Sequence, residues 1–169
     1  MVETTTPTAT ELSTKMKQWQ GGVVAGLVGG ALFGILLTFE MRPAIESAIP
    51  ALFGLSGGLW GWIVHMSIAA VLGVVFAAIL TKMPTVGRDM QKNVAVGLAY
   101  GFVLWVVLAV FVMPVWLDAV GFAGAPVVPN VNYTSLLGHL VYGAAVGAVY
   151  PLVTYANMGT EARTGTQPQ

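Results

Sequence analysis

The sequence predicts an all-α integral membrane protein, a four-helix bundle built from two tandem, parallel helical hairpins. Three observations lead to this prediction: a scarcity of charge, four long apolar segments, and the recurrence of the same residues in both halves of the chain. Of the 169 residues, 56% are hydrophobic and 8% are charged, whereas soluble domains carry about 25% charged residues. So little charge cannot cover a surface in water, which places the chain among membrane proteins.

Four apolar segments are predicted to cross the bilayer, at residues 21–39, 59–80, 93–113 and 135–156. A crossing takes ~20 residues at ~1.5 Å each to span ~30 Å of hydrocarbon. In lipid each backbone polar group must bond within its own segment, so the segments are expected to be helices. The expected domains are a polar N-terminal tail at 1–20, a membrane domain at 21–157 and a C-terminal tail at 158–169.

The first segment carries a row of glycines at every fourth position, and the third and fourth segments carry shorter rows. Small residues let helices approach closely in lipid, where no hydrophobic force drives helices together. We interpret the rows as packing surfaces within the bundle; the alternative is that the first row mediates oligomerisation. The residues are Gly22, Gly26, Gly30, Gly34, Gly97, Gly101, Gly143 and Gly147.

The two longer links, "RPAIESAIPALFGLSGG" and "PVWLDAVGFAGAPVVPNVNY", are apolar and rich in Pro and Gly. Exposed loops are normally more polar, so these links are predicted to lie at the membrane interface and to cap the bundle. Lys and Arg set the orientation, because they favour the cytoplasmic side. Only Arg42 lies in a longer link, whereas the termini and the middle link contain Lys15, Lys17, Lys82, Arg88, Lys92 and Arg163. The prediction is a multi-pass plasma-membrane protein with both termini inside.

The two halves of the membrane domain are predicted to be an internal duplication, with repeat one at 21–82 and repeat two at 92–157. Gly26 and Gly30 correspond to Gly97 and Gly101 at an offset of 71, while His65 corresponds to His139 at an offset of 74. A unit of two spans returns the chain to its starting side, so both copies share one orientation. The expected relation is a pseudo-twofold axis along the membrane normal.

His65 and His139, the only histidines of the chain, are the candidate functional pair. Each lies a turn or two inside the outer end of its predicted helix. An ionisable residue within a span is a functional hypothesis by default. One interpretation is purely structural: a neutral imidazole that bonds a carbonyl or hydroxyl group on a neighbouring helix.

Two other interpretations give the pair a function. The imidazoles could be the axial ligands of a haem b, a ligation scheme that suits a four-helix bundle. Alternatively they could form a proton- or ion-handling site on the outer side, together with the candidate acids Glu40 and Asp118. A zinc site is not expected, because two histidines leave two ligands unassigned.

The stretches "GLAYGFVLWVV", "MPVWL" and "SLLGHLVYGAAVGAVY" resemble small four-span membrane proteins that are common in halophilic archaea and also found in bacteria. That group is similar in turn to the YagU-like inner-membrane proteins, which are linked to acid resistance. The resemblance covers about residues 21–157 and implies fold and topology rather than activity. Some members are labelled histidine kinases; here both histidines lie inside predicted spans and no ATP-binding domain exists.

The sequence contains no phosphate loop, GxSxG motif or acidic metal cluster, so no enzyme class is indicated. Its net charge of zero gives no reason to expect nucleic acid as a partner. The expected function is non-enzymatic and cofactor-free, as an envelope-stress component or an ion or small-solute permeation component. The alternatives are a bis-histidine haem b electron-transfer subunit and a structural subunit. The expected partners are the lipid bilayer and either a second copy or a larger membrane complex.

Overall fold

The computed structural model describes residues 9–83, 86 and 89–164, and the side chains of 18–83, 86 and 89–154. All regular elements in this part of the chain are helical. They are α1 (Ala9–Glu40), η1 (Ala44–Ala48), α2 (Ile49–Ala51), α3 (Gly58–Thr81), α4 (Met90–Leu104), η2 (Trp105–Val112), α5 (Met113–Ala119) and α6 (Tyr133–Thr164).

Four helical stretches are long and apolar enough to cross a membrane, and each contains most of one predicted span. They are Gln18–Glu40, Gly58–Thr81, Met90–Ala119 and Tyr133–Thr154. The four predicted helices are therefore present, with different ends. α1 already begins at Ala9, within the segment predicted as a tail, and α6 continues to Thr164. No Pro or Gly interrupts residues 9–20, so nothing in that stretch breaks a helix.

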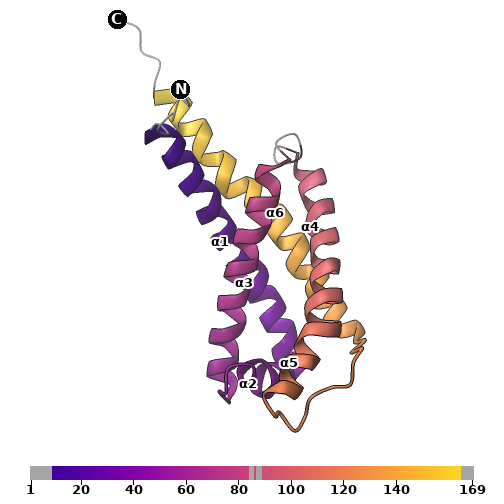
Figure 1. Cartoon of the computed structure of the whole chain (residues 1–169). Coiled ribbons are helices and arrows are strands. Elements are labelled where there is room, and N and C mark those ends of the chain that lie inside the picture. The colour runs from indigo at the N-terminus through magenta and orange to yellow at the C-terminus, as the bar shows by residue number, and fades with distance from the viewer. Residues whose placement is uncertain (1–8, 84–85, 87–88, 165–169) are drawn as a thin grey trace, which may run out of the picture.

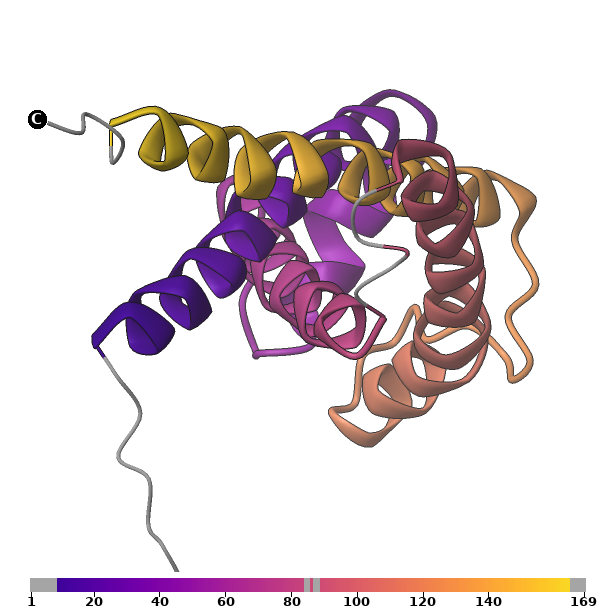
Figure 2. The same cartoon turned by 90° about the horizontal axis from the view of Figure 1, so that it is seen from above.

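The helices form a row in the order α3, α1, α6, α4. α1 packs along both α3 and α6, and α4 packs along α6, whereas no extended packing joins α3 to α4 within the described residues. Figure 2 shows α4 standing apart from α3. In Figure 1 the start of α1 and the end of α6 lie at the same end of the bundle, here named the terminal end. The links at 41–57 and 120–132, together with α5, form the opposite or capped end.

Within each hairpin the helices meet at glycines. A Cβ atom on Gly22 would lie 2.7 Å from the carbonyl oxygen of Gly73, so the backbones are in direct contact. In the second hairpin a Cβ on Gly97 would clash with the carbonyl of Gly143, and one on Gly143 with that of Gly97. The glycine row of α1 thus faces α3, inside the bundle. Residues of the two hairpin interfaces correspond at the offsets of 71 and 74 found in the sequence.

α1 and α6 meet through a second set of glycines, which the sequence analysis did not single out. A Cβ on Gly21 would lie 2.5 Å from the hydroxyl of Thr154, and one on Gly29 would lie 3.0 Å from the carbonyl of Tyr142. Gly138 of α6 leaves room for the ring of Phe33. Small residues at these positions therefore allow α1 and α6 to pack along their length.

At the offsets of 71 and 74, larger residues occupy the matching positions on α4 and α3. Lys92 corresponds to Gly21, Tyr100 to Gly29 and Val64 to Gly138. α3 and α4 do not pack along one another as α1 and α6 do. Tyr100 instead reaches across and donates a hydrogen bond from its hydroxyl to the carbonyl of Leu72, at 2.8 Å. The bundle is consequently open on the side between α3 and α4.

The third long helix is irregular, and this explains why it runs past its predicted end at residue 113. Its middle part, η2, is a π-helix, and α5 follows with Pro114 in its first turn. Pro114 has no N–H to donate to the carbonyl four residues earlier. That carbonyl, of Val110, accepts a hydrogen bond from the backbone N–H of Asn130 at 3.0 Å. The long link is thereby anchored to the helix.

Candidate functional site

A cavity of about 810 Å³ lies on the open side of the bundle, towards the capped end. Its walls come from α1, α3, the end of α4, η2, α5 and α6, and residues of both longer links contribute to them. Most of the surface is apolar, including Leu37, Ile68, Leu72, Leu108, Val112 and Met113. The side predicted to carry the histidines is therefore hollow and largely hydrocarbon in character.

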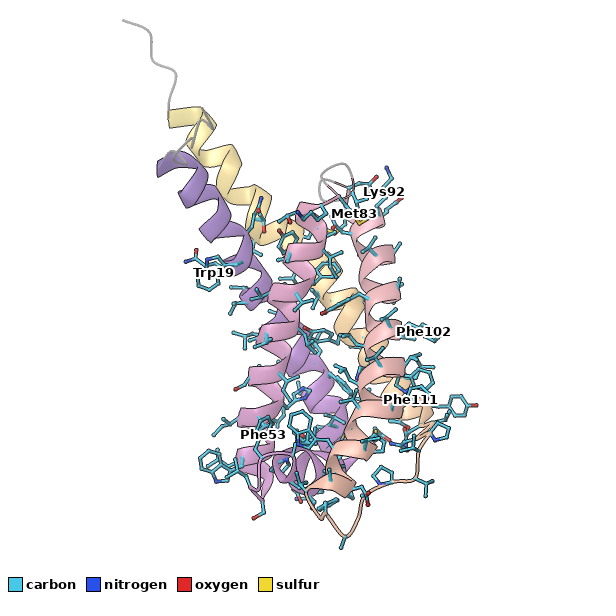
Figure 3. The ribbon with its side chains drawn as sticks, viewed as in Figure 1. Trp19, Phe53, Met83, Lys92, Phe102 and Phe111 are labelled. Atoms are coloured by element: carbon cyan, nitrogen blue, oxygen red, sulfur yellow. The ribbon has the colours of Figure 1, made fainter. Side chains whose placement is uncertain are left out.

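The two longer links close the capped end of this cavity. Pro43, Ala44 and Ile49 of the first link and Pro126 of the second are among its walls. The rings of Phe53 and Trp116 lie 5.9 Å apart, so the first link and α5 touch across the open side. Figure 3 labels Phe53 at this end of the bundle. The links thus cap the bundle next to the histidines.

Aromatic side chains close the cavity towards the terminal end. Tyr142 of α6 donates a hydrogen bond from its hydroxyl to the carbonyl of Ala69, at 2.8 Å. Further towards the terminal end, the ring of Phe76 lies 5.4 Å from that of Tyr100 and 6.1 Å from that of Tyr150. Rings from α3, α4 and α6 thus fill the bundle between the cavity and the terminal end.

His65 is buried in the wall of the cavity, with only 8% of its surface exposed. Its Nε2 lies 2.9 Å from the carbonyl oxygen of Gly30 on α1. The close approach of α3 to α1 at the glycine row makes this bond possible. The Cδ2 atom of the same ring faces Gly34, 3.2 Å from where a Cβ would lie. The Nε2–Cδ2 edge of the imidazole therefore faces α1.

His139 also lines the cavity, but its hydrogen bond is different. Its Nδ1 lies 2.7 Å from the carbonyl oxygen of Ser135, one turn earlier on the same helix. The ring of Phe33 contacts both imidazoles, with centroid distances of 5.4 Å to His65 and 4.8 Å to His139. The structure therefore brings the two histidines together around Phe33, and each bonds a backbone carbonyl.

This arrangement does not fit a bis-histidine haem. The Nε2 atom of His65 faces the Gly30 carbonyl, and the ring of Phe33 packs against both imidazoles where a macrocycle would need room. Within the described residues, no three His, Cys, Asp or Glu side chains come together as a metal site.

The candidate acids lie away from the histidines. Glu40 and Asp118 are exposed, at the ends of α1 and α5, and neither is among the described residues that line the cavity. A third acid, Glu46, accepts a hydrogen bond from Arg42 at 2.8 Å on the surface of the first link. This bond raises the pKa of the Arg42 guanidinium above its usual value. The structure therefore groups the histidines with aromatic and aliphatic residues.

Sequence reasoning missed Phe33, Tyr142 and the Phe53–Trp116 pair. The sequence nevertheless contained a signal for the opening. At an offset of 71 from Gly21 and Gly29, the second half of the chain has Lys92 and Tyr100 instead of glycines. In comparisons with known proteins, no family model, curated protein or solved structure matches this chain.

Proposed function

We propose that this chain is a non-enzymatic, multi-pass membrane protein that binds an apolar molecule taken from the surrounding lipid. The observation that carries the proposal is the largely apolar cavity of about 810 Å³ on the side where α3 and α4 do not pack together. The site fits a common type of ligand pocket, which is concave, mostly apolar and supplied with a few polar groups.

The surroundings of the cavity support entry from lipid. The outer surfaces of α3 and α4 expose large apolar side chains, including Val71 at 63% and Val103 at 54%. Figure 3 shows Phe102 and Phe111 pointing away from the bundle on the far side of α4 and η2. A hydrocarbon chain in the bilayer would therefore meet an apolar surface up to the gap between α3 and η2.

Binding is favoured over permeation by what lies beyond the cavity. Ions or solutes moving along the bundle axis would have to displace the rings of Phe76, Tyr100 and Tyr150. Charged and polar species also gain little from walls that are almost entirely aliphatic and aromatic. These features support a pocket that opens to lipid on one side and does not continue through the bundle as a channel.

Topology and origin form the second part of the proposal. The described ends of the chain lie on one side of the bundle, and Lys82 and Lys92 lie at that same end. This supports a plasma-membrane orientation with both termini inside. The hairpin contacts that correspond at offsets of 71 and 74 support a tandem duplication.

We also retain membership of the four-span family as a proposal, together with an envelope role and assembly with a second copy or a larger complex.

A photo-crosslinking experiment tests the binding proposal. Purified protein in lipid nanodiscs is mixed with an alkane that carries a diazirine and is then exposed to ultraviolet light. The labelled residues are mapped by peptide mass spectrometry. Labelling of Leu72 and Met113, in the cavity, should reach a plateau as the probe concentration rises. It should decrease when an alkane without the diazirine is added as a competitor. Labelling of Val71 and Val103, outside it, should rise in proportion to the probe.

Neighbouring residues of η2 provide a matched pair of variants. Leu108 lines the cavity, whereas Val107 is 46% exposed and is not among its lining residues. Leu108→Trp should fill the cavity and abolish saturable labelling, and Val107→Trp should leave it unchanged. Equal labelling of both variants, or unsaturable labelling of the native protein, would contradict the proposal.

A further inference from the structure

The polar groups at the deep end of the cavity share a chemical property. They are His65, His139 and Tyr142, from α3 and α6. A ligand that leaves lipid for an apolar pocket gains little from burial itself, because lipid tails are as apolar as the pocket. Selection among lipids must therefore come from shape and from these polar groups. The inference that follows rests on the proposed binding function.

The hydrogen bond of His65 fixes which of its nitrogens carries the proton. A backbone carbonyl can only accept a hydrogen bond, so the Nε2 atom that faces Gly30 must be the N–H donor. In a neutral imidazole the other nitrogen, Nδ1, is then an acceptor. Because the Nε2–Cδ2 edge faces α1, the edge that contains Nδ1 faces away from that helix.

The same reasoning gives the opposite tautomer for His139. Its Nδ1 donates to the carbonyl of Ser135, so Nε2 is the acceptor. Nδ1 also lies 3.5 Å from the hydroxyl oxygen of Ser135, which offers it a second, weaker acceptor. Nε2 is at the tip of the ring, directed away from the backbone of α6. Both imidazoles therefore present a lone pair rather than an N–H.

Two further observations concern the groups around the two imidazoles. The single hydroxyl hydrogen of Tyr142 is used in its bond to Ala69, so its oxygen has only lone pairs left to offer. Within the described residues, no carboxylate lines the cavity that could stabilise a charged imidazolium. An unpaired buried charge is costly, so both rings are neutral. Ser47, Trp116, Asn130 and Ser135 also line the cavity; the first three belong to the capped end, and the Ser135 hydroxyl lies beside His139.

We infer that the cavity selects a neutral hydrocarbon that carries a hydroxyl group, with the hydroxyl hydrogen donated to the acceptor nitrogen Nε2 of His139. The hydrocarbon tail leaves between α3 and η2. Ligands whose polar ends are only acceptors, such as ethers, esters, quinones and ionised fatty acids, cannot make this bond. The two sources of such a ligand are an isoprenoid alcohol and a glyceride with a free hydroxyl.

The test compares ligands that differ by one hydrogen-bond donor. Tritiated farnesol is bound to the protein in nanodiscs, and its displacement by unlabelled farnesol, farnesyl methyl ether and 1,2-dioctanoylglycerol is measured by scintillation proximity. The alcohol should bind about three- to tenfold more tightly than its methyl ether, the factor that one hydrogen bond supplies. The tighter of the two hydroxylated ligands identifies the source.

Variants connect the preference to His139. His139→Phe keeps an aromatic ring but removes the acceptor, so it should abolish the preference while the methyl ether binds as before. Unchanged ether binding also shows that the variant is folded. Tyr133 is 77% exposed and is not among the cavity lining, so Tyr133→Phe, which removes its hydroxyl group, should keep the preference.

The outcomes separate this inference from the binding proposal. Equal affinity for alcohol and ether in the native protein, or a full preference in His139→Phe, would overturn the inference alone. Saturable alkane labelling without any displacement by the hydroxylated ligands would do the same. If no hydrocarbon labels the cavity saturably, the proposed function itself fails.

Discussion

The first hairpin meets the second on two sides of the bundle, where α1 faces α6 and where α3 faces α4. The α1–α6 side is closed by packing, whereas the α3–α4 side is open. On the closed side, Gly21, Gly29 and Gly138 let the backbones approach. On the open side, Lys92, Tyr100 and Val64 stand at the matching positions. The two sides of the bundle therefore differ both in helix packing and in the size of the residues at the corresponding positions.

The largest expected effect comes from making the closed interface resemble the open one. Gly29→Leu places a side chain where even a Cβ would lie 3.0 Å from the Tyr142 carbonyl and 3.1 Å from Val146. Overpacking of this kind destabilises by about 3 kcal/mol, because α1 and α6 must move apart. The free energy of unfolding, measured in mixed micelles with a denaturing detergent, reports the loss. Val28→Leu, on the exposed neighbour, is the control and should change it by less than about 0.5 kcal/mol.

A second comparison concerns the contact inside each hairpin near the capped end. In the first hairpin Gly34 makes room for the ring of Trp62. In the second, the buried Trp105 packs with Leu136, and these residues correspond to Gly34 and Trp62 at the same offsets. The large side chain therefore lies on α3 in one hairpin and on η2 in the other.

This exchange predicts a rescue. Gly34→Trp alone should destabilise the fold by about 3 kcal/mol, because its side chain would collide with Trp62. Adding Trp62→Leu recreates the pair found in the second hairpin and should recover at least about half of that loss. A double-mutant cycle on the free energy of unfolding measures the coupling. Additive losses would show that the two hairpins do not pack equivalently.

The third prediction concerns the link that α5 and η2 hold on the open side. Asn130→Pro removes the N–H that bonds the buried Val110 carbonyl, so it should destabilise by about 1–3 kcal/mol. Pro114→Ala restores an N–H in the helix, so Asn130→Pro should cost less in that background. The unfolding free energies of the two single variants and the double variant test this. Equal costs in both backgrounds would mean that the Asn130 bond does not compensate for Pro114.

The architecture could be read from the sequence to a considerable extent. Hydropathy and length predicted the four long helices, and the i+4 glycines identified the surface of α1 that meets α3. The opening between α3 and α4 was not predicted, because it depends on which residues are absent from a repeat, such as the glycine that Tyr100 replaces. The end of the third helix was also missed, since the hydrogen bond that the Val110 carbonyl accepts beside Pro114 comes from Asn130, which lies far along the chain.

The histidines illustrate the same division between local and long-range information. Their spacing in the two halves predicted a related pair, and the structure places both in the wall of one cavity. Their bonding partners could not be inferred, because His65 bonds another helix and His139 bonds its own. Phe33, which contacts both rings, comes from a segment where it looked like one more apolar residue.

The smallest expected effect tests whether Tyr100 holds the open side at its present width through its hydroxyl group or through its ring. Tyr100→Phe removes the hydrogen bond to the Leu72 carbonyl but keeps the ring against Phe76. Bonds between helices in lipid contribute about 0.6 kcal/mol on average, so the unfolding free energy should fall by that amount. Saturable alkane labelling of Leu72 should persist, because the ring still separates α3 from α4. Loss of the labelling would show instead that the hydroxyl bond keeps the cavity open, and Tyr133→Phe, at an exposed hydroxyl, controls for the chemical change itself.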